Sequence, residues 1–271
     1  MPTILWTGDL HLDHASAAAR DALRTSIRDT AGSVLVIAGD TSVAARLTSD
    51  LEFLADAAAR PVYFVLGNHD HYGSTVAHVR DAVLALSERR PEIQWLPPAG
   101  VMMLDHDTAL VGVDGWADGR LGDPFTTQFV LNDDRLIGEI ATPGTRVGKL
   151  TVKRALADAD AHRLQVLLGR AVATARQVVI ATHVPPFVEA LPRMGRLAHP
   201  GWQPLLVCGA TGAVIRQAAE AHPDHTFLVL CGHTHAPTDV LVTGNLRCIV
   251  AGARYGDPGV RTLELNGGAR H

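Results

Sequence analysis

The chain has 271 residues, 47% of them hydrophobic, and a formal net charge of −4. This length and apolar content are sufficient for one large domain with a full core. A negative net charge does not attract nucleic acid or an anionic membrane surface. A phosphorylated substrate would therefore need a local positive group, and a metal centre is one that a charge count does not reveal.

Cysteine usage and the N-terminal residues indicate the compartment. Cys208, Cys231 and Cys248 are widely spaced and form no CxxC pair, which argues against a disulfide framework and against a thiolate zinc site. Residues 3–6 are already strand-like, with no basic leader or long apolar run before them, so we predict no signal peptide and no membrane span. These features predict a soluble, cytoplasmic protein.

The first part of the chain alternates between predicted strands and predicted helices. Near-continuous apolar runs predict buried strands over residues 3–6, 33–38 and 61–67. Helical periodicity predicts helices over residues 16–28, 43–59 and 74–89. This alternation is typical of βαβ units and of a largely parallel sheet. Residues 92–114 instead predict short antiparallel strands joined by tight turns, which lead into a second sheet.

Residues 115–152 are the least regular part, and we predict an inserted loop or cap within a single domain that covers residues 1–271. Its polar and aromatic residues either line a pocket mouth or are solvated loop residues; they are Trp116, Asp118, Arg120 and Asp123. Beyond it we predict helices over 152–174 and 213–222, and strands over 177–181, 226–230, 239–242, 246–251 and 261–265. Residues 187–206 form a long connection without predicted secondary structure, and such loops are often functional.

Five predicted strand ends carry side chains of the kinds that bind metal ions. They are Asp9 with His11, Asp40, Asn68 with His69, His183, and His233 with His235. Open α/β sheets bind their ligands at the carboxyl ends of the strands, so we expect these side chains to converge. Carboxylate, amide and imidazole without thiolate favour Mn, Fe or Zn. The set is too large for one ion and divides naturally between two metal ions that share a carboxylate.

In chain order the motifs are Asp9-Leu10-His11, Gly39-Asp40, Gly67-Asn68-His69-Asp70, a lone His183 and Gly232-His233-Thr234-His235. With these five motifs the sequence resembles the calcineurin-like metallophosphoesterase superfamily over most of its length. The resemblance implies an α/β fold, a four-layer α/β/β/α sandwich of two mixed β-sheets flanked by helices.

The resemblance also implies a role for each motif residue. One metal ion would be held by Asp9, His11 and His235. The other would be held by Asn68, His183 and His233, with Asp40 bridging the two. His69 would be the acid that meets the leaving group or the phosphate, and Asp70 its orienting partner. The implied activity is hydrolysis of a phosphate mono- or diester by a hydroxide that bridges two metal ions.

Differences from known subfamilies limit the substrate. The protein serine/threonine phosphatases carry G-D-x-V-D-R-G and R-G-N-H-E, whereas this chain has Gly39-Asp40-Thr41-Ser42-Val43 and Leu66-Gly67-Asn68-His69-Asp70. We therefore do not expect a protein phosphatase. Many cyclic-nucleotide phosphodiesterases of the superfamily have an acidic residue where this chain has Val43-Ala44-Ala45, which leaves that assignment open. Because the net charge is negative, we expect a small phosphorylated substrate. A nuclease acting on nucleic-acid ends is the second choice, and a non-catalytic binding module on the same fold is the alternative from another class. The sequence does not indicate an oligomeric state.

The long connection supplies candidates for substrate binding, namely Arg193, Arg196 and His199. Arginine presents a planar fork of donors that fits phosphate oxygens. The alternative is that all three are solvated loop residues.

Overall fold

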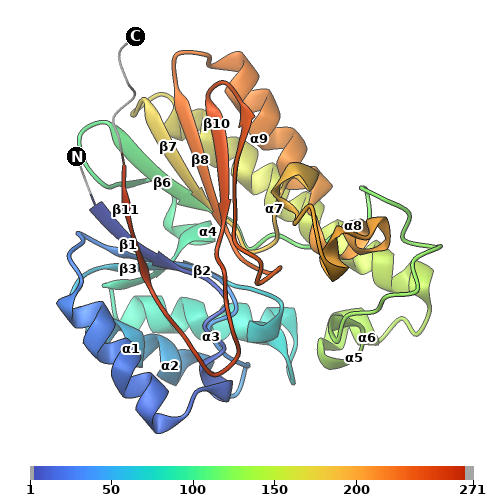
Figure 1. Ribbon diagram of the computed structural model, residues 1–271, viewed down its shortest axis with the longest axis horizontal. Helices are drawn as coiled ribbons and strands as arrows, with labels where there is room; N and C mark the ends of the chain where they lie inside the picture. The colour runs from blue at the N-terminus through green and yellow to red at the C-terminus, as the bar shows by residue number, and fades with distance from the viewer. Residues whose placement is uncertain (1–2, 266–271) are drawn as a thin grey trace.

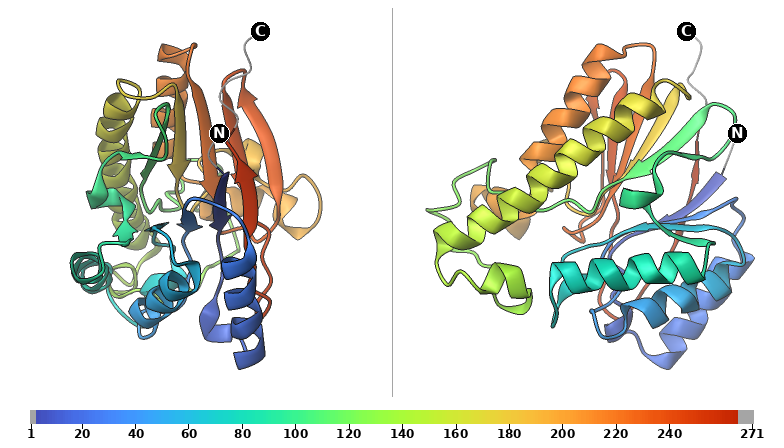
Figure 2. Two further views of the ribbon diagram at one scale, coloured as in Figure 1. Left: turned by 90° about the vertical axis from the view of Figure 1, so that its left-hand side faces the viewer. Right: turned by 180° about the vertical axis from the view of Figure 1, so that it is seen from behind.

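The computed structural model describes residues 3–265, in which two mixed β-sheets pack face to face between layers of helices (Figures 1 and 2). The first sheet contains, in spatial order, β11 (Arg261–Glu264), β1 (Thr3–Thr7), β2 (Leu35–Ala38), β3 (Val62–Val65) and β4 (Ile93–Trp95). The second contains β5 (Met102–Met103), β6 (Thr108–Gly112), β7 (Gln177–Ala181), β8 (Thr226–Cys231), β10 (Leu246–Val250) and β9 (Thr238–Thr243). The predicted fold class is confirmed.

The continuous apolar runs of the strands arise because both faces of each sheet are covered. In β1, Leu5 belongs to the core beneath α1 (Ala17–Asp29), α2 (Leu47–Ala58) and α3 (Val76–Arg89), whereas Ile4 lies in the core between the sheets. In β7, Val178 belongs to the core beneath α7 (Arg146–Ala171) and α9 (Gly209–Ala221), whereas Val179 lies between the sheets. Successive side chains of a strand point to opposite faces, so the inner positions of both strands are apolar.

Residues 92–114 differ from their prediction. β4 pairs parallel to β3, with Ile93 opposite Val62, so it extends the first sheet and is not an antiparallel addition. The short helix α4 (Leu96–Ala99) then leads to the second sheet, where β6 pairs antiparallel to β5 but parallel to β7. Helix α3 provides the crossover that a parallel pair requires. A local apolar pattern does not distinguish the two directions, because both bury the same faces.

The insertion and the long connection are more regular than predicted. The insertion contains α5 (Asp133–Leu136) and α6 (Gly138–Ala141), and α7 begins at Arg146, earlier than expected. The long connection contains 3₁₀ turns at Val188–Ala190, Arg196–Ala198 and Pro200–Trp202, followed by α8 (Gln203–Leu206). An apolar cluster that includes Trp202, Leu206 and Phe129 joins the two segments into one lobe, at the right of Figure 1. No helix within residues 3–265 is both long and apolar enough to cross a bilayer.

The charged residues of the insertion mainly fix its position. Asp118 is fully buried, and it accepts hydrogen bonds from the backbone nitrogens of Gly209 (3.2 Å) and Ala210 (2.9 Å). Arg120 pairs with the same carboxylate at 2.8 Å. Asp118 therefore lies neither at a pocket mouth nor in solvent, and it ties the insertion to the first turn of α9.

Candidate metal centre

The carboxyl ends of parallel strands from both sheets meet at one edge, where all seven predicted metal ligands lie. Backbone hydrogen bonds hold the loops together: Asp9 N donates to Gly39 O at 3.0 Å, and Gly232 N donates to His183 O at 2.9 Å. The ligands follow β1 (Asp9, His11), β2 (Asp40), β3 (Asn68), β7 (His183) and β8 (His233, His235).

The first group of side chains consists of Asp9, His11, Asp40 and His235, whose ligand atoms all lie within 4.8 Å of one another. His11 Nε2 lies 3.0 Å from His235 Nε2, which lies 3.7 Å from Asp9 Oδ1. Asp9 Oδ2 and His11 Nδ1 are buried and have no hydrogen-bond partner among residues 3–265. Buried polar atoms are almost always satisfied in proteins. A carboxylate oxygen left free beside two facing imidazoles therefore fits a divalent metal ion.

The second group consists of Asp40, Asn68, His183 and His233. Asn68 Oδ1 lies 3.0 Å from both His183 Nε2 and His233 Nδ1. Asp40 Oδ2 lies 3.4 Å from His183 Nε2 and 3.8 Å from His11 Nε2. One carboxylate oxygen of Asp40 thus lies between the two groups.

Backbone carbonyls determine which histidine nitrogens face the second group. His183 Nδ1 lies 2.9 Å from Ala38 O, and His233 Nε2 lies 3.0 Å from Leu205 O. Since a carbonyl only accepts, these two nitrogens carry hydrogen atoms, and when the rings are neutral, as metal ligation requires, the other nitrogen of each presents a lone pair to Asn68 Oδ1. Two lone pairs and an amide oxygen that face one another repel unless a cation lies between them. The second group therefore also fits a metal ion.

Asp133, which no sequence motif marks, orients the Asn68 amide. Its Oδ1 accepts from Asn68 Nδ2 and from Tyr72 Oη, both at 2.8 Å, and only 4% of Asp133 is exposed. The bond directs Asn68 Oδ1 toward the histidines. Asp133 lies 65 residues from Asn68, in the insertion, so only the folded chain brings the two together.

The ligand loops have a strained backbone. Within residues 3–265, five of the six non-glycine residues with positive φ are predicted ligands: Asp9, His11, Asp40, His233 and His235, with φ between 42° and 70°. Each such conformation costs on the order of 1–3 kcal/mol and persists where the surrounding structure enforces it, typically at functional sites. The strain supports the assignment of these loops to the site.

Two glycines in the motifs allow close approach to the carboxylates. A Cβ at Gly232 would lie 2.6 Å from Asp9 Oδ2, and a Cβ at Gly67 would overlap the Asp40 carboxylate. Gly67 does not have a positive φ, so its role is to leave room for Asp40.

His69 lies at the site but outside both groups of ligand atoms. Its backbone nitrogen donates to Asp40 Oδ1 at 2.8 Å, and its half-buried ring stacks on Tyr72 with centroids 4.2 Å apart. In the described part of the chain, its ring nitrogens make no hydrogen bond. The ring is therefore free to donate to a substrate, as predicted for the acid.

Asp70 is not the partner of His69 that the sequence predicted. Its carboxylate accepts from Ser42 N at 3.0 Å and from Gly67 N at 2.8 Å, and within residues 3–265 no hydrogen bond joins it to the His69 ring. Burial raises the pKa of Asp70 to about 8, an effect that the Asp40 carboxylate reinforces. The structure assigns Asp70 to the loops that follow β2 and β3, which it holds together.

The side chains of the site have shifted pKa values, and a bound cation would reverse the shifts of Asp9 and His183. Burial raises the pKa of Asp9 to about 7, with His183 opposing and Asp40 reinforcing the shift. Burial also lowers the pKa of His11 to about 3 and that of His233 to about 4. Burial disfavours a charged His183 as well, but the Asp40 carboxylate outweighs it and raises the pKa to about 10. A bound cation would favour the ionised carboxylates and neutral imidazoles that ligation requires.

Four of the predicted ligands, Asp40, Asn68, His233 and His235, line a cavity of about 470 Å³, here called the His69 cavity. Its walls include Arg196, whose guanidinium carbon lies 5.3 Å from the centre of the Trp202 ring. Of the three predicted substrate-binding residues, Arg196 reaches this cavity. His199 lines a separate cavity and accepts from Gly201 N at 3.0 Å, and Arg193 is exposed at the surface.

Tyr255 also lines the His69 cavity, although it belongs to no motif. Its ring centroid lies 4.5 Å from that of His11 and 5.1 Å from that of His235. It lies on the connection between β10 and β11, which runs past the metal ligands before the chain returns to the first sheet (Figure 1). Sequence reasoning missed it because a single tyrosine after the last motif has no distinguishing pattern.

The chain belongs to the calcineurin-like phosphoesterase family, whose model matches residues 2–237. A solved structure of Phosphopantetheinyl Hydrolase from Mycobacterium tuberculosis superimposes with a TM-score of 0.65 at 17% identity, covering 94% of this chain and 90% of that one. A dimetal phosphatase from Danio rerio superimposes with a TM-score of 0.60 at 14% identity, covering 97% and 92%. At these identities the similarity establishes the fold alone. No curated protein matches the sequence.

Proposed function

We propose that this protein is a dinuclear metal-dependent phosphoesterase that hydrolyses a phosphate mono- or diester. The observation that supports this most directly is the position of Asp40, whose Oδ2 lies 3.8 Å from His11 Nε2 in the first group and 3.4 Å from His183 Nε2 in the second. A carboxylate shared by two complete ligand sets is what two neighbouring cations require. The family to which the chain belongs supports the same reaction class.

Mn, Fe or Zn ions, when bound, neutralise phosphate charge and lower the pKa of a coordinated water. The chain's own residues provide position and proton transfer. Asp40 and the rest of the ligand set fix where the phosphate lies, and His69 borders the same cavity with its ring nitrogens free. A proton from His69 would assist departure of the leaving-group oxygen. Tyr72 stacks on the ring and limits its orientations.

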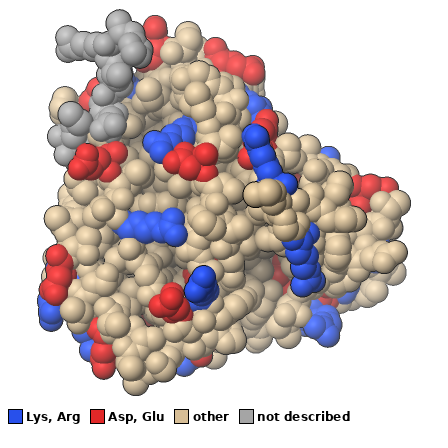
Figure 3. Space-filling view, viewed as in Figure 1, with Lys and Arg blue, Asp and Glu red and all other residues tan. Residues whose placement is uncertain are grey.

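A small phosphorylated substrate is favoured over nucleic acid. The chain carries a net charge of −4, and the face drawn in Figure 3 has acidic and basic side chains interspersed without a basic stripe. Nucleic-acid binding depends mainly on basic surface that neutralises phosphates. The nuclease alternative has no feature on this face that supports it.

The test uses the purified protein loaded with Mn²⁺ and matched chromogenic phosphate mono- and diesters. We expect metal-dependent hydrolysis that an Asp40→Asn variant lacks, because the amide cannot neutralise two cations. Turnover of the parent at the level of Asp40→Asn on every ester would refute the proposal. If that inactive parent nevertheless bound two metal ions, the result would favour the non-catalytic binding module.

A further inference from the structure

A second cavity adjoins the metal centre, and His69 is not among the residues that line it. It has a volume of about 410 Å³ and is here called the Arg254 cavity. Asp9 and His235, two ligands of the first group, form part of its wall, and His235 lines the His69 cavity as well. A molecule whose phosphate lies at the metal ligands could therefore extend into either cavity.

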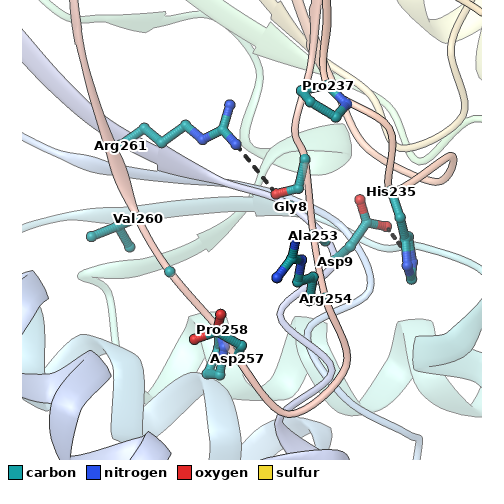
Figure 4. A pocket seen from close by; sticks show the side chains of 12 residues that line it. Gly8, Asp9, His235, Pro237, Ala253, Arg254, Asp257, Pro258, Val260 and Arg261 are labelled. Atoms are coloured by element: carbon teal, nitrogen blue, oxygen red, sulfur yellow. Dashed lines mark hydrogen bonds and ion pairs between the residues drawn. The ribbon is translucent and has the colours of Figure 1, made fainter. Parts of the chain in front are cut away.

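The opposite wall of the Arg254 cavity comes from the connection between β10 and β11 and from β11 itself. Arg254 projects into the cavity beside Asp9, and Arg261 reaches toward it from β11 (Figure 4). Both residues lie outside the range of 2–237 that the family model matches.

The two arginines are free to bind an anion. Within residues 3–265, the Arg254 guanidinium has no partner, and that of Arg261 contacts only the Gly252 carbonyl, at 3.5 Å. Asp257 also lines the cavity but forms no ion pair with either arginine in this part of the chain. By contrast, Arg247 on the neighbouring strand β10 is neutralised by Asp239. Unpaired guanidinium groups provide planar donors that match phosphate oxygens.

Hydrogen bonds hold the connection in a fixed place relative to the metal ligands. Ala253 N donates to His235 O at 3.2 Å, Asp257 N donates to Arg254 O at 3.1 Å, and Thr7 Oγ1 donates to Gly259 O at 2.7 Å. The segment is thus attached at one end to the loop of His235 and at the other to β1, which leads to Asp9. Arg254 is positioned with the metal ligands and does not lie on a free loop.

We propose that the Arg254 cavity binds a second phosphate group of the substrate while the reacting phosphate lies at Asp40. The substrate class is then a compound with two phosphate groups separated by a short linker, one of which is hydrolysed. This inference rests on the proposed function for the place of the reacting phosphate. Asp9, the other acidic group in the wall, faces the ligand cluster, so a bound metal ion would offset its charge.

The test measures binding, so that it does not depend on turnover. The Mn²⁺-loaded protein is titrated calorimetrically with short α,ω-alkanediol bisphosphates of several chain lengths and with the matching monophosphates that end in a hydroxyl. We expect at least one bisphosphate to bind about tenfold more tightly than its monophosphate. A factor of about ten is what a single charge-assisted hydrogen bond between the second phosphate and an exposed arginine should contribute, since solvent weakens it. Arg254→Ala should abolish this preference. Arg254→Gln, which keeps most of the side chain, should do the same if the alanine variant fails to fold.

Arg28→Ala is the matched control, because it removes one exposed arginine of α1 and should keep the preference. Arg196→Ala tests whether the second phosphate instead binds in the His69 cavity, which Arg196 borders. Equal binding of both ligands at every length, a preference that survives Arg254→Ala, or a preference lost only in Arg196→Ala would each overturn the inference. An Arg254-dependent preference without hydrolysis of any ester would instead support the subsite and count against the proposed function.

Discussion

Replacing Asp133 with alanine should weaken one metal site selectively. Asp133 contacts no predicted ligand atom, but its Oδ1 accepts from Asn68 Nδ2 and Tyr72 Oη, both at 2.8 Å. Without that acceptor the Asn68 amide keeps only the longer bond to Tyr72 Oη, at 3.1 Å, so its oxygen is held less firmly toward His183 and His233. Losing the partner that orients a ligand typically costs about 10- to 100-fold in metal affinity. We expect that loss for the second metal ion and little change for the first.

The same substitution should lower the free energy of unfolding. Each buried donor left without an acceptor costs about 1–3 kcal/mol, so two donors would cost roughly 2–6 kcal/mol. Asn68 Nδ2 also lies 3.1 Å from Tyr72 Oη, which can still accept from it. We therefore expect a value in the lower part of that range, about 2–3 kcal/mol. Denaturant unfolding of the metal-free protein measures it.

Asp133→Asn separates positioning from general stability. Both hydrogen bonds go to Oδ1, so an asparagine keeps the acceptor and removes only the charge. A chelator-buffered Mn²⁺ titration, fitted to two sites, should show the second affinity restored close to that of the parent. Two parent-like affinities in Asp133→Ala would refute the reasoning. Equal weakening of both sites would mean that Asp133 acts through the fold and not through Asn68.

Four further outcomes follow from the site. Asp40→Ala should abolish activity and reduce bound metal, and two equivalents retained by elemental analysis would contradict a shared carboxylate. His69→Ala should lose rate but keep both metals, with a smaller loss for esters of acidic leaving groups; an equal loss on all esters would indicate phosphate positioning instead. Arg196→Ala should raise KM for the natural substrate class while barely changing that of a minimal aryl phosphate; identical KM values in both proteins would place substrate selection elsewhere. Burial raises the pKa of Asp9 to about 7, so below that pH a metal ion must displace a proton from the carboxyl group in order to bind. Mn²⁺ affinity should therefore fall as the pH decreases through this range, and an affinity that does not change with pH would contradict this prediction.

The sequence by itself predicted where the strands lie and which side chains gather at the candidate metal centre. Continuous apolar runs marked the strands because both faces of each sheet are buried, and buried polar residues such as Thr7, Thr108 and Gln177 lie at strand ends. Polar residues directly after those runs, such as Asp40 after β2, marked the site because strand ends in such sheets meet at one edge. Both signals are local, so they can be read without knowing which strands are neighbours.

The direction of a strand and the hydrogen-bond partners of a site residue could not be predicted from the local sequence. β4 was predicted to be antiparallel, because an apolar pattern reports which faces are buried and not which partner is beside them. Asp70 was assigned to His69 as its sequence neighbour, whereas its carboxylate turns to the backbone of Ser42, on the loop after another strand. In each case the deciding contact joins separate segments of the chain.

Tertiary structure alone decided what surrounds the metal ligands. Asp133 reaches Asn68 across 65 residues, and Tyr255 and Arg254 come to the site because β11 returns to pair with β1. These residues have no characteristic spacing from the motifs, since their positions depend on how an insertion and a terminal strand pack. Metal binding requires particular side-chain types, so the predicted ligands can be recognised in the sequence. A cavity wall can be formed by any segment that packs beside the site, and only the folded structure shows which segment does so.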